Sequence, residues 1–134
     1  QGYCSDMTRT IFMGCILEEI KPVYDLALKN LELSTKEITD GYTIKTAANM
    51  VESDFKVNGY NLIHALGHGV GLEVHELPFI RLKNEANFKE NMVIADEPGI
   101  YLPGKYGIRI EDTLLVTKDG SERLTKSERG YVVI

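Results

Sequence analysis

Two stretches in the first half of the chain carry apolar residues at alternating spacings of three and four, the repeat of an amphipathic helix. The first is predicted to run from about residue 20 to residue 39, because Pro22 is tolerated only in a first turn and Gly41 follows the stripe. The second is predicted over residues 43–57, because Asn58-Gly59 is a typical helix end. Both apolar stripes are expected to pack into a core.

Residues 3–12 are rich in aromatic and β-branched types, which favours a strand. Because side chains alternate between the two faces of a strand, one face of this segment is mostly polar and includes an aspartate. Such a face is either exposed to solvent or forms the floor of a polar site. Its members are Cys4, Asp6, Thr8, Thr10 and Phe12.

The second half of the chain is predicted to be a series of strands joined by turns. Because the helices come first and the strands follow, the pattern favours an α+β fold in a single domain, residues 1–134. One face of the strand predicted over residues 108–117 carries Arg109, Glu111, Thr113 and Leu115. The expected segments are a short strand or extended loop at 78–82, a polar connection at 83–91, strands at 92–97 and 108–117 separated by a turn, a hairpin turn at 118–120 and a return strand at 121–125.

The composition, with 43% hydrophobic and 26% charged residues, is that of an ordinary globular domain. The net charge of −5 argues against nucleic acid and anionic membranes as partners, and no apolar run approaches the roughly 20 residues of a membrane span. Cys4 and Cys15 form no C-x-x-C pair and are expected to be reduced, partly buried thiols of a cytoplasmic protein. The chain opens on Gln1-Gly-Tyr without a methionine, so we expect it to be a piece of a longer protein.

All three histidines, His64, His68 and His75, lie in one short stretch whose glycines surround the middle one. Histidine is the commonest metal ligand and a usual acid or base near neutral pH, and glycine lets a backbone pass where no side chain fits. The stretch therefore indicates a site without defining its type. The sequence excludes a His-Glu-x-x-His zinc helix, a phosphate loop ending in Gly-Lys-Ser/Thr and a Gly-x-Ser-x-Gly nucleophile elbow.

Acidic side chains stand at unusual places in the predicted strands. Glu97 precedes Pro-Gly at a strand end, and Arg109 and Glu111 are two apart on one face, where a surface ion pair is an equally good interpretation. With Asp6 and His68, these two glutamates make three carboxylates and one imidazole. Such a set suits a hard or borderline divalent ion such as manganese, iron, cobalt or zinc.

Four motifs, in order along residues 3–112, resemble those of the pita-bread metallopeptidases. The resemblance is greatest to the Xaa-Pro branch, aminopeptidase P and prolidase, and smaller to the methionine aminopeptidase branch. It implies an α+β fold with two helices and a curved, mostly antiparallel sheet. The motifs are Tyr3-Cys-Ser-Asp-Met-Thr-Arg-Thr10, the histidine stretch around Gly67-His-Gly-Val-Gly71, Glu97-Pro-Gly-Ile-Tyr101 and Gly107-Ile-Arg-Ile-Glu-Asp112.

The resemblance implies a centre of two divalent ions held by two aspartates, one histidine and two glutamates. Asp6 matches the second aspartate, His68 the histidine, and Glu97 and Glu111 the glutamates. The family's first aspartate lies upstream of Asp6, in a stretch that residues 1–134 do not contain. We therefore expect an impaired centre with one ion or none, manganese being the expected metal and cobalt, zinc or iron the alternatives.

The same resemblance implies hydrolysis of the Xaa-Pro peptide bond, in dipeptides or at peptide N-termini, by a hydroxide that bridges the two ions. His75 would stabilise the oxyanion and, with His64, hold the substrate, while Glu97 would carry a proton to the leaving nitrogen. Arg109 would orient Glu111, and the glycines of the histidine stretch would let the chain pass close to the metals. The implied partners are a proline-containing peptide and a second copy in a homodimer.

Two other functions occur on this fold, a non-catalytic binding module and a metal-free hydrolase resembling creatinase. Both have lost or replaced the metal ligands, so the four ligand-type residues of this chain argue against them. Within the peptidases, the sequence does not separate prolidase from aminopeptidase P.

Overall fold

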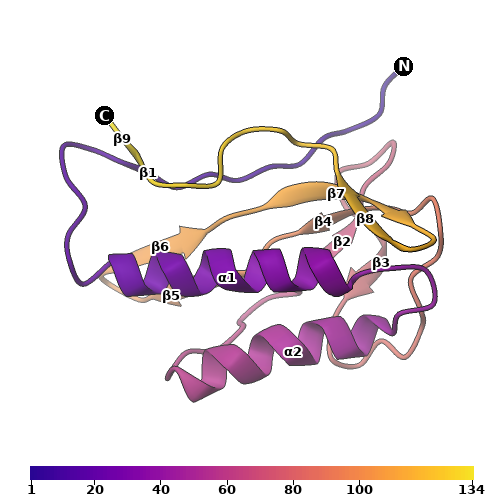
Figure 1. Cartoon of the computed structure of the whole chain (residues 1–134), viewed down its shortest axis with the longest axis horizontal. Coiled ribbons are helices and arrows are strands. Elements are labelled where there is room, and N and C mark those ends of the chain that lie inside the picture. Colours follow the sequence, from indigo (N-terminus) through magenta and orange to yellow (C-terminus); the bar gives the residue numbers. More distant parts are fainter.

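The computed structural model describes residues 1–134 and places two helices on one side of a β-sheet (Figure 1). Helix α1 (Lys21–Glu37) and helix α2 (Ile44–Val57) lie within two residues of the predicted bounds. Gly41 and Gly59, which follow the two helices, have positive φ angles of 80° and 84°. A side chain would strain this conformation, so glycine suits both ends. Both helix predictions are confirmed.

The main sheet has five strands in the order β3, β2, β4, β7 and β8, and every neighbouring pair is antiparallel. This arrangement confirms the α+β prediction. Strand β2 is short but lies between two other strands, so the side chain at its middle is held from both sides. The bounds are β2 Gly67–Gly69, β3 Glu76–Ile80, β4 Val93–Asp96, β7 Asp112–Thr117 and β8 Gly120–Arg123.

Strands β5 (Gly99–Leu102) and β6 (Tyr106–Arg109) form a separate hairpin. The prediction of one continuous strand over residues 108–117 is wrong, because the chain changes its pairing partner within that range. Strand β6 pairs with β5, whereas β7 pairs with β4 and β8. The change leaves Glu111 between the two sheets, where it forms an isolated bridge with Thr8.

The strand predicted over residues 3–12 is only partly formed. Strand β1 covers Ile11–Phe12 and pairs in parallel with β9 (Val132–Val133), so the end of the N-terminal segment lies beside the C-terminal strand (Figure 1). A strand requires a continuous ladder with a neighbour, and residues before β1 make only scattered hydrogen bonds. The predicted alternation is present, since the even-numbered side chains from residue 4 to 12 are buried or partly buried. The odd-numbered ones, except Arg9, are exposed.

The apolar stripes of both helices are buried against the inner face of the sheet, as their periodicity predicts. Helix α1 contacts β4, β5, β6 and β8, and helix α2 contacts β3. The largest completely buried side chains are contributed by both layers, so the core fixes the sheet relative to the helices. They include Tyr24, Leu31, Ile44 and Phe55 from the helices and Ile80, Ile94, Ile108 and Ile110 from the strand region.

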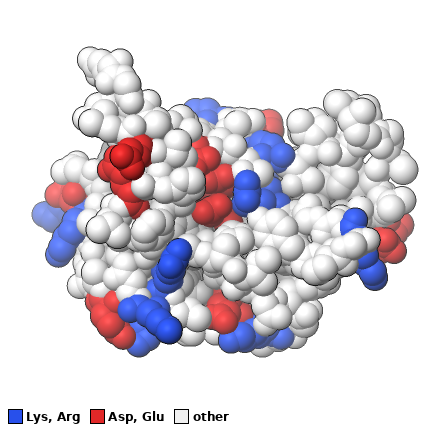
Figure 2. Space-filling model, turned by 180° about the vertical axis from the view of Figure 1, so that it is seen from behind, with Lys and Arg blue, Asp and Glu red and all other residues white.

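The surface shows charges of both signs. On the face seen in Figure 2, Lys and Arg side chains are interspersed with Asp and Glu side chains rather than separated into two regions. Neither helix has the length and hydropathy that crossing a membrane requires. Both cysteines are free, but Cys15 is exposed, so the prediction of partial burial holds only for Cys4.

Candidate metal centre

His68 occupies the middle of strand β2 and is 3% exposed. Its Nδ1 atom lies 3.0 Å from the carbonyl oxygen of Gly69. A carbonyl oxygen only accepts hydrogen bonds, so Nδ1 carries a proton and Nε2 is the ring nitrogen that is left to bind a cation. That Nε2 atom lies 3.6 Å from Asp6 Oδ2 and 3.6 Å from Glu97 Oε1. A lone pair facing two carboxylates is unfavourable unless a proton or a cation lies between them.

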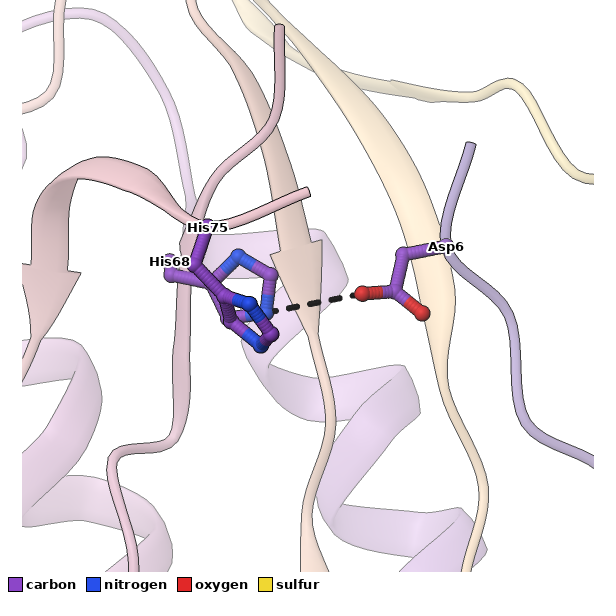
Figure 3. A group of neighbouring side chains, drawn as sticks. All are labelled: Asp6, His68 and His75. Carbon is purple, nitrogen blue, oxygen red and sulfur yellow. Dashed lines mark ion pairs between the residues drawn. The ribbon is translucent and has the colours of Figure 1, made fainter. Parts of the chain in front are cut away.

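The predicted ligands come from separate segments that meet at this point. Asp6 lies on the N-terminal segment, Glu97 directly follows β4, and Glu111 lies between β6 and β7. One ligand atom each from His68, Glu97 and Glu111 lies within 4.8 Å of the others, and the same holds for Asp6, His68 and His75. Figure 3 shows the rings of His68 and His75 beside each other, facing the Asp6 carboxylate.

Ionising every carboxylate at this point is costly. Burial, together with the nearby carboxylates of Asp6 and Glu97, raises the pKa of Glu111 to about 7 against the opposing effects of Thr8 and Arg109. A divalent cation would remove this cost by favouring the ionised form of every carboxylate. Three carboxylates and one imidazole lone pair therefore fit a divalent ion, in agreement with the donor set expected from the sequence.

Arg109 reaches Glu111 through a residue that sequence reasoning did not assign to the site. Its Nε atom is 3.9 Å from the nearest oxygens of both Glu97 and Glu111, but it donates a hydrogen bond of 3.0 Å to the hydroxyl of Thr8. The Thr8 hydroxyl in turn donates to Glu111 Oε2. The only signal in the sequence was that Thr8 shares the polar strand face with Asp6.

Tyr101 is a second site residue that sequence reasoning missed. Its hydroxyl accepts a hydrogen bond of 3.2 Å from Arg109 Nη1, and its ring packs edge-on against His64 at a centroid distance of 5.4 Å. A Cβ atom at Gly99 or Gly107 would lie 2.7 Å from the Tyr101 side chain, so both glycines make room for this ring. The motif that contains Tyr101 was recognised, but the role of the ring depends on the β5–β6 hairpin.

The two non-ligand histidines lie in different environments. His75 is adjacent to the proposed ligand His68, with ring centroids 4.2 Å apart. His64 Nδ1 lies 2.6 Å from the carbonyl oxygen of Ala65, while its Nε2 atom is buried without a hydrogen-bond partner. His64 also lines a cavity of about 500 Å³ between α2 and the end of β3, which is mostly apolar. The other side chains around this cavity include Ala48, Glu52, Leu62, Ile80 and Leu82.

The glycines of the histidine stretch do not have the role that we predicted. A Cβ atom at Gly67 would lie 1.9 Å from the carbonyl oxygen of Ala95, and one at Gly69 would lie 2.3 Å from that of Leu77. A Cβ atom at Gly71 would meet the carboxylate of Glu76 at 2.5 Å. These glycines therefore allow neighbouring backbone and one carboxylate to approach β2, rather than clearing space beside a metal ion.

A buried acid lies directly before Glu97. Asp96 is completely buried, its Oδ2 accepts a hydrogen bond of 2.5 Å from Ser34 Oγ, and its Oδ1 has no partner. Burial raises the pKa of Asp96 to about 8, against the opposing effects of Ser34 and Arg129. Between the ordinary pKa of 3.8 and this value, the folded state binds a proton that the unfolded state has released, so stability falls as the pH rises.

We expect Asp96→Asn to remove the loss of stability that burial of the Asp96 carboxyl causes as the pH rises. Between pH 6 and pH 8, the folding equilibrium constant of the wild type, divided by that of the variant, should fall by up to about tenfold per pH unit. Above pH 8 this ratio should level off. Urea unfolding at several pH values in the presence of EDTA measures this difference. The exposed Asp119→Asn is the matched control. A constant difference between Asp96→Asn and wild type across this range would contradict the assignment.

The fold and the converging donors are those of a metallopeptidase. The sequence profile of metallopeptidase family M24 matches residues 1–118, and the chain belongs to this family. A relative named Xaa-Pro dipeptidase, from Pyrococcus horikoshii, is 45% identical over 134 residues, which cover 98% of this chain and 38% of the relative.

Solved structures of related peptidases superpose closely on this chain. The X-Pro aminopeptidase of Thermotoga maritima superposes with a TM-score of 0.95 at 39% identity, over 99% of this chain and 38% of that protein. Prolidase from Pyrococcus furiosus superposes with a TM-score of 0.92 at 44% identity, over 95% of this chain and 38% of that protein. The pita-bread fold expected from the motifs is confirmed, and the chain spans somewhat over a third of these relatives.

Proposed function

We propose that this chain carries the ligands for one divalent cation of an Xaa-Pro peptidase, with manganese as the first candidate and cobalt, zinc or iron as alternatives. The observation that carries the proposal is the position of His68 Nε2, which lies 3.6 Å from a carboxylate oxygen of Asp6 and 3.6 Å from one of Glu97. The proposed ligands are Asp6, His68, Glu97 and Glu111. The names of the relatives, Xaa-Pro dipeptidase and X-Pro aminopeptidase, support the substrate class.

When bound, a divalent cation at this position would lower the pKa of a water molecule and polarise a substrate carbonyl. Glu97 is buried enough to act as a ligand but retains 15% exposure of its side chain, so it can also exchange a proton with the substrate nitrogen. His75 borders the donor group on its exposed side, where it can donate a hydrogen bond to the carbonyl oxygen as negative charge develops.

The remaining residues would position the substrate. Arg109 keeps 41% of its side chain exposed and is held by Thr8 and Tyr101, so its charge is available at the entrance to the donor group. His64, packed against Tyr101, would form one wall of the pocket. The buried, unpartnered Nε2 of His64 is consistent with a hydrogen bond to be made with another molecule, since such atoms are costly when left unpaired.

Two measurements on the same sample test the proposal. Native mass spectrometry should find one Mn²⁺ per chain, and release of proline from the dipeptide Ala-Pro should exceed cleavage of Ala-Ala. The rate should be lower than that of the Pyrococcus horikoshii dipeptidase, of which this chain spans 38%. Glu97→Gln should abolish both signals, whereas Glu122→Gln, which changes an exposed carboxylate on β8, should change neither.

The outcomes separate the three functions considered. Two tightly held ions per chain would contradict the proposed stoichiometry. A bound cation without any cleavage of Ala-Pro would favour a binding module on the pita-bread fold. Cleavage that persists in metal-free buffer would favour a hydrolase of the creatinase type.

A further inference from the structure

Two threonines lie in equivalent positions on the two segments that meet at the donor group. Thr8 follows the proposed ligand Asp6 by two residues, and Thr113 follows the proposed ligand Glu111 by two residues. Each threonine bonds to the ligand residue of the opposite segment. The Thr8 hydroxyl donates to the Glu111 carboxylate, whereas the Thr113 hydroxyl accepts from the Asp6 amide at 3.2 Å and donates to the Asp6 carbonyl oxygen at 2.6 Å.

The direction of the Thr8 hydrogen bonds is determined by its neighbours. A hydroxyl group has one proton to donate, and a guanidinium group only donates. Because Arg109 Nε donates to the Thr8 oxygen at 3.0 Å, the single Thr8 proton is available for Glu111. The Glu111 carboxylate is therefore oriented by a donor that is itself held by a charged side chain.

These contacts matter because the backbone contributes little to joining the two segments. The backbone pairing between them is the isolated bridge of Thr8 with Glu111, with one amide hydrogen bond of 3.0 Å. Side chains supply the other contacts. Arg9 donates a hydrogen bond of 2.7 Å to the carbonyl oxygen of Glu111 and forms an ion pair of 2.7 Å with Asp112. The Thr10 hydroxyl donates a hydrogen bond of 3.0 Å to the carbonyl oxygen of Arg109. Unlike His68, which lies in a strand paired on both sides, Asp6 lies outside any strand. Apart from the single bridge, its position relative to Glu111 thus depends on side-chain contacts.

We propose that Thr8 and Thr113 are positioning residues of the metal centre, Thr8 acting through the Glu111 carboxylate and Thr113 through the Asp6 backbone. The proposal rests on the proposed function, since it concerns the same donor group. It assigns the effect to the hydroxyl groups and not to the volume of the side chains. Valine, which has the shape of threonine without the hydroxyl, should therefore fail where serine succeeds.

The test uses the full chain and Mn²⁺. Removal of a residue that supports a metal ligand typically lowers metal affinity about 10- to 100-fold, so Thr8→Val should weaken Mn²⁺ binding by this amount in isothermal titration calorimetry. Thr8→Ser should retain most of the wild-type affinity for Mn²⁺. The visible absorption spectrum of bound Co²⁺, which reports coordination geometry, should change in Thr8→Val and not in Thr8→Ser. The melting temperature in EDTA shows whether each variant is folded.

A second pair of variants and one ligand variant complete the test. Thr113→Val should likewise weaken Mn²⁺ binding, and Thr113→Ser should retain most of it. If Thr8→Val does not fold, this second pair tests whether the hydroxyl group positions a ligand. Unchanged affinity in both valine variants, together with loss of binding in Glu111→Gln, would overturn the positioning role and leave the metal centre standing. Equal losses in the serine and valine variants would also overturn it. Wild-type binding in Glu111→Gln, or no binding by the wild type, would overturn both the centre and the positioning role.

Discussion

Replacing His68 by glutamine should abolish Mn²⁺ binding, whereas the same change at His75 should leave binding nearly intact. The carboxylates of Asp6 and Glu97 both face His68 Nε2, and glutamine offers no imidazole nitrogen at that place. Since loss of a supporting residue already costs about 10- to 100-fold, loss of this ligand should cost at least about 100-fold in affinity. Isothermal titration calorimetry with Mn²⁺ measures the effect.

His75 is the matched control, because it has the same chemistry and lies beside His68 with ring centroids 4.2 Å apart. One of its nitrogen atoms lies within 4.8 Å of possible ligand atoms of Asp6 and His68, so the structure alone permits a second ligand histidine. We expect His75→Gln to lose cleavage of Ala-Pro while it keeps the bound ion. A comparable loss of Mn²⁺ affinity in both variants would show that His75 is a ligand, contrary to our assignment.

Replacing Gly67 by alanine should strongly destabilise the fold. The new Cβ atom would lie 1.9 Å from the carbonyl oxygen of Ala95 and 3.1 Å from a methyl group of Ile80, on the strands that flank β2. Backbone atoms of a central sheet cannot move as a flexible side chain can, so β2 would have to separate from β4. Overpacking usually costs about 1–3 kcal/mol, and we expect this backbone clash to exceed about 3 kcal/mol in the free energy of unfolding.

Urea unfolding followed by circular dichroism measures this loss. Gly120→Ala is the control, because a Cβ atom at Gly120 meets no atom within 4 Å. Equal urea midpoints for Gly67→Ala and the wild type would mean that β2 can shift without cost. In that case, the close approach of β2 to β4 would not explain why glycine stands at position 67.

The helices could be predicted from sequence because their determinants are local. Each determinant acts within a few residues of the others: an apolar stripe, Pro22 in the first turn of α1, and a glycine after each helix. Both helices lie where expected. Strand limits depend on partners that are distant in the chain. The segment over residues 3–12 has strand-like composition but little pairing. The break before β7 arises because β6 pairs with β5 whereas β7 pairs with β4.

The ligand residues were predicted for a different reason. Asp6, His68, Glu97 and Glu111 were chosen by their places in four motifs and by the ligand chemistry of their side chains, and the structure places them in two groups of possible ligands that share His68. Thr8 was not found, because threonine is common on strand faces and its role depends on which acceptor the fold places beside it. Hydrogen-bond partners of this kind are set by tertiary contacts.

The four proposed ligands are spread over most of the chain, from Asp6 near the N-terminus to Glu111 directly before β7. A cation that all four hold would act as a reversible cross-link between these distant points. It would close long loops in the chain and so resist unfolding in the manner of a disulfide bond, with the added feature that a chelator can release it. The N-terminal segment, which belongs to no sheet before β1, would gain most from this link.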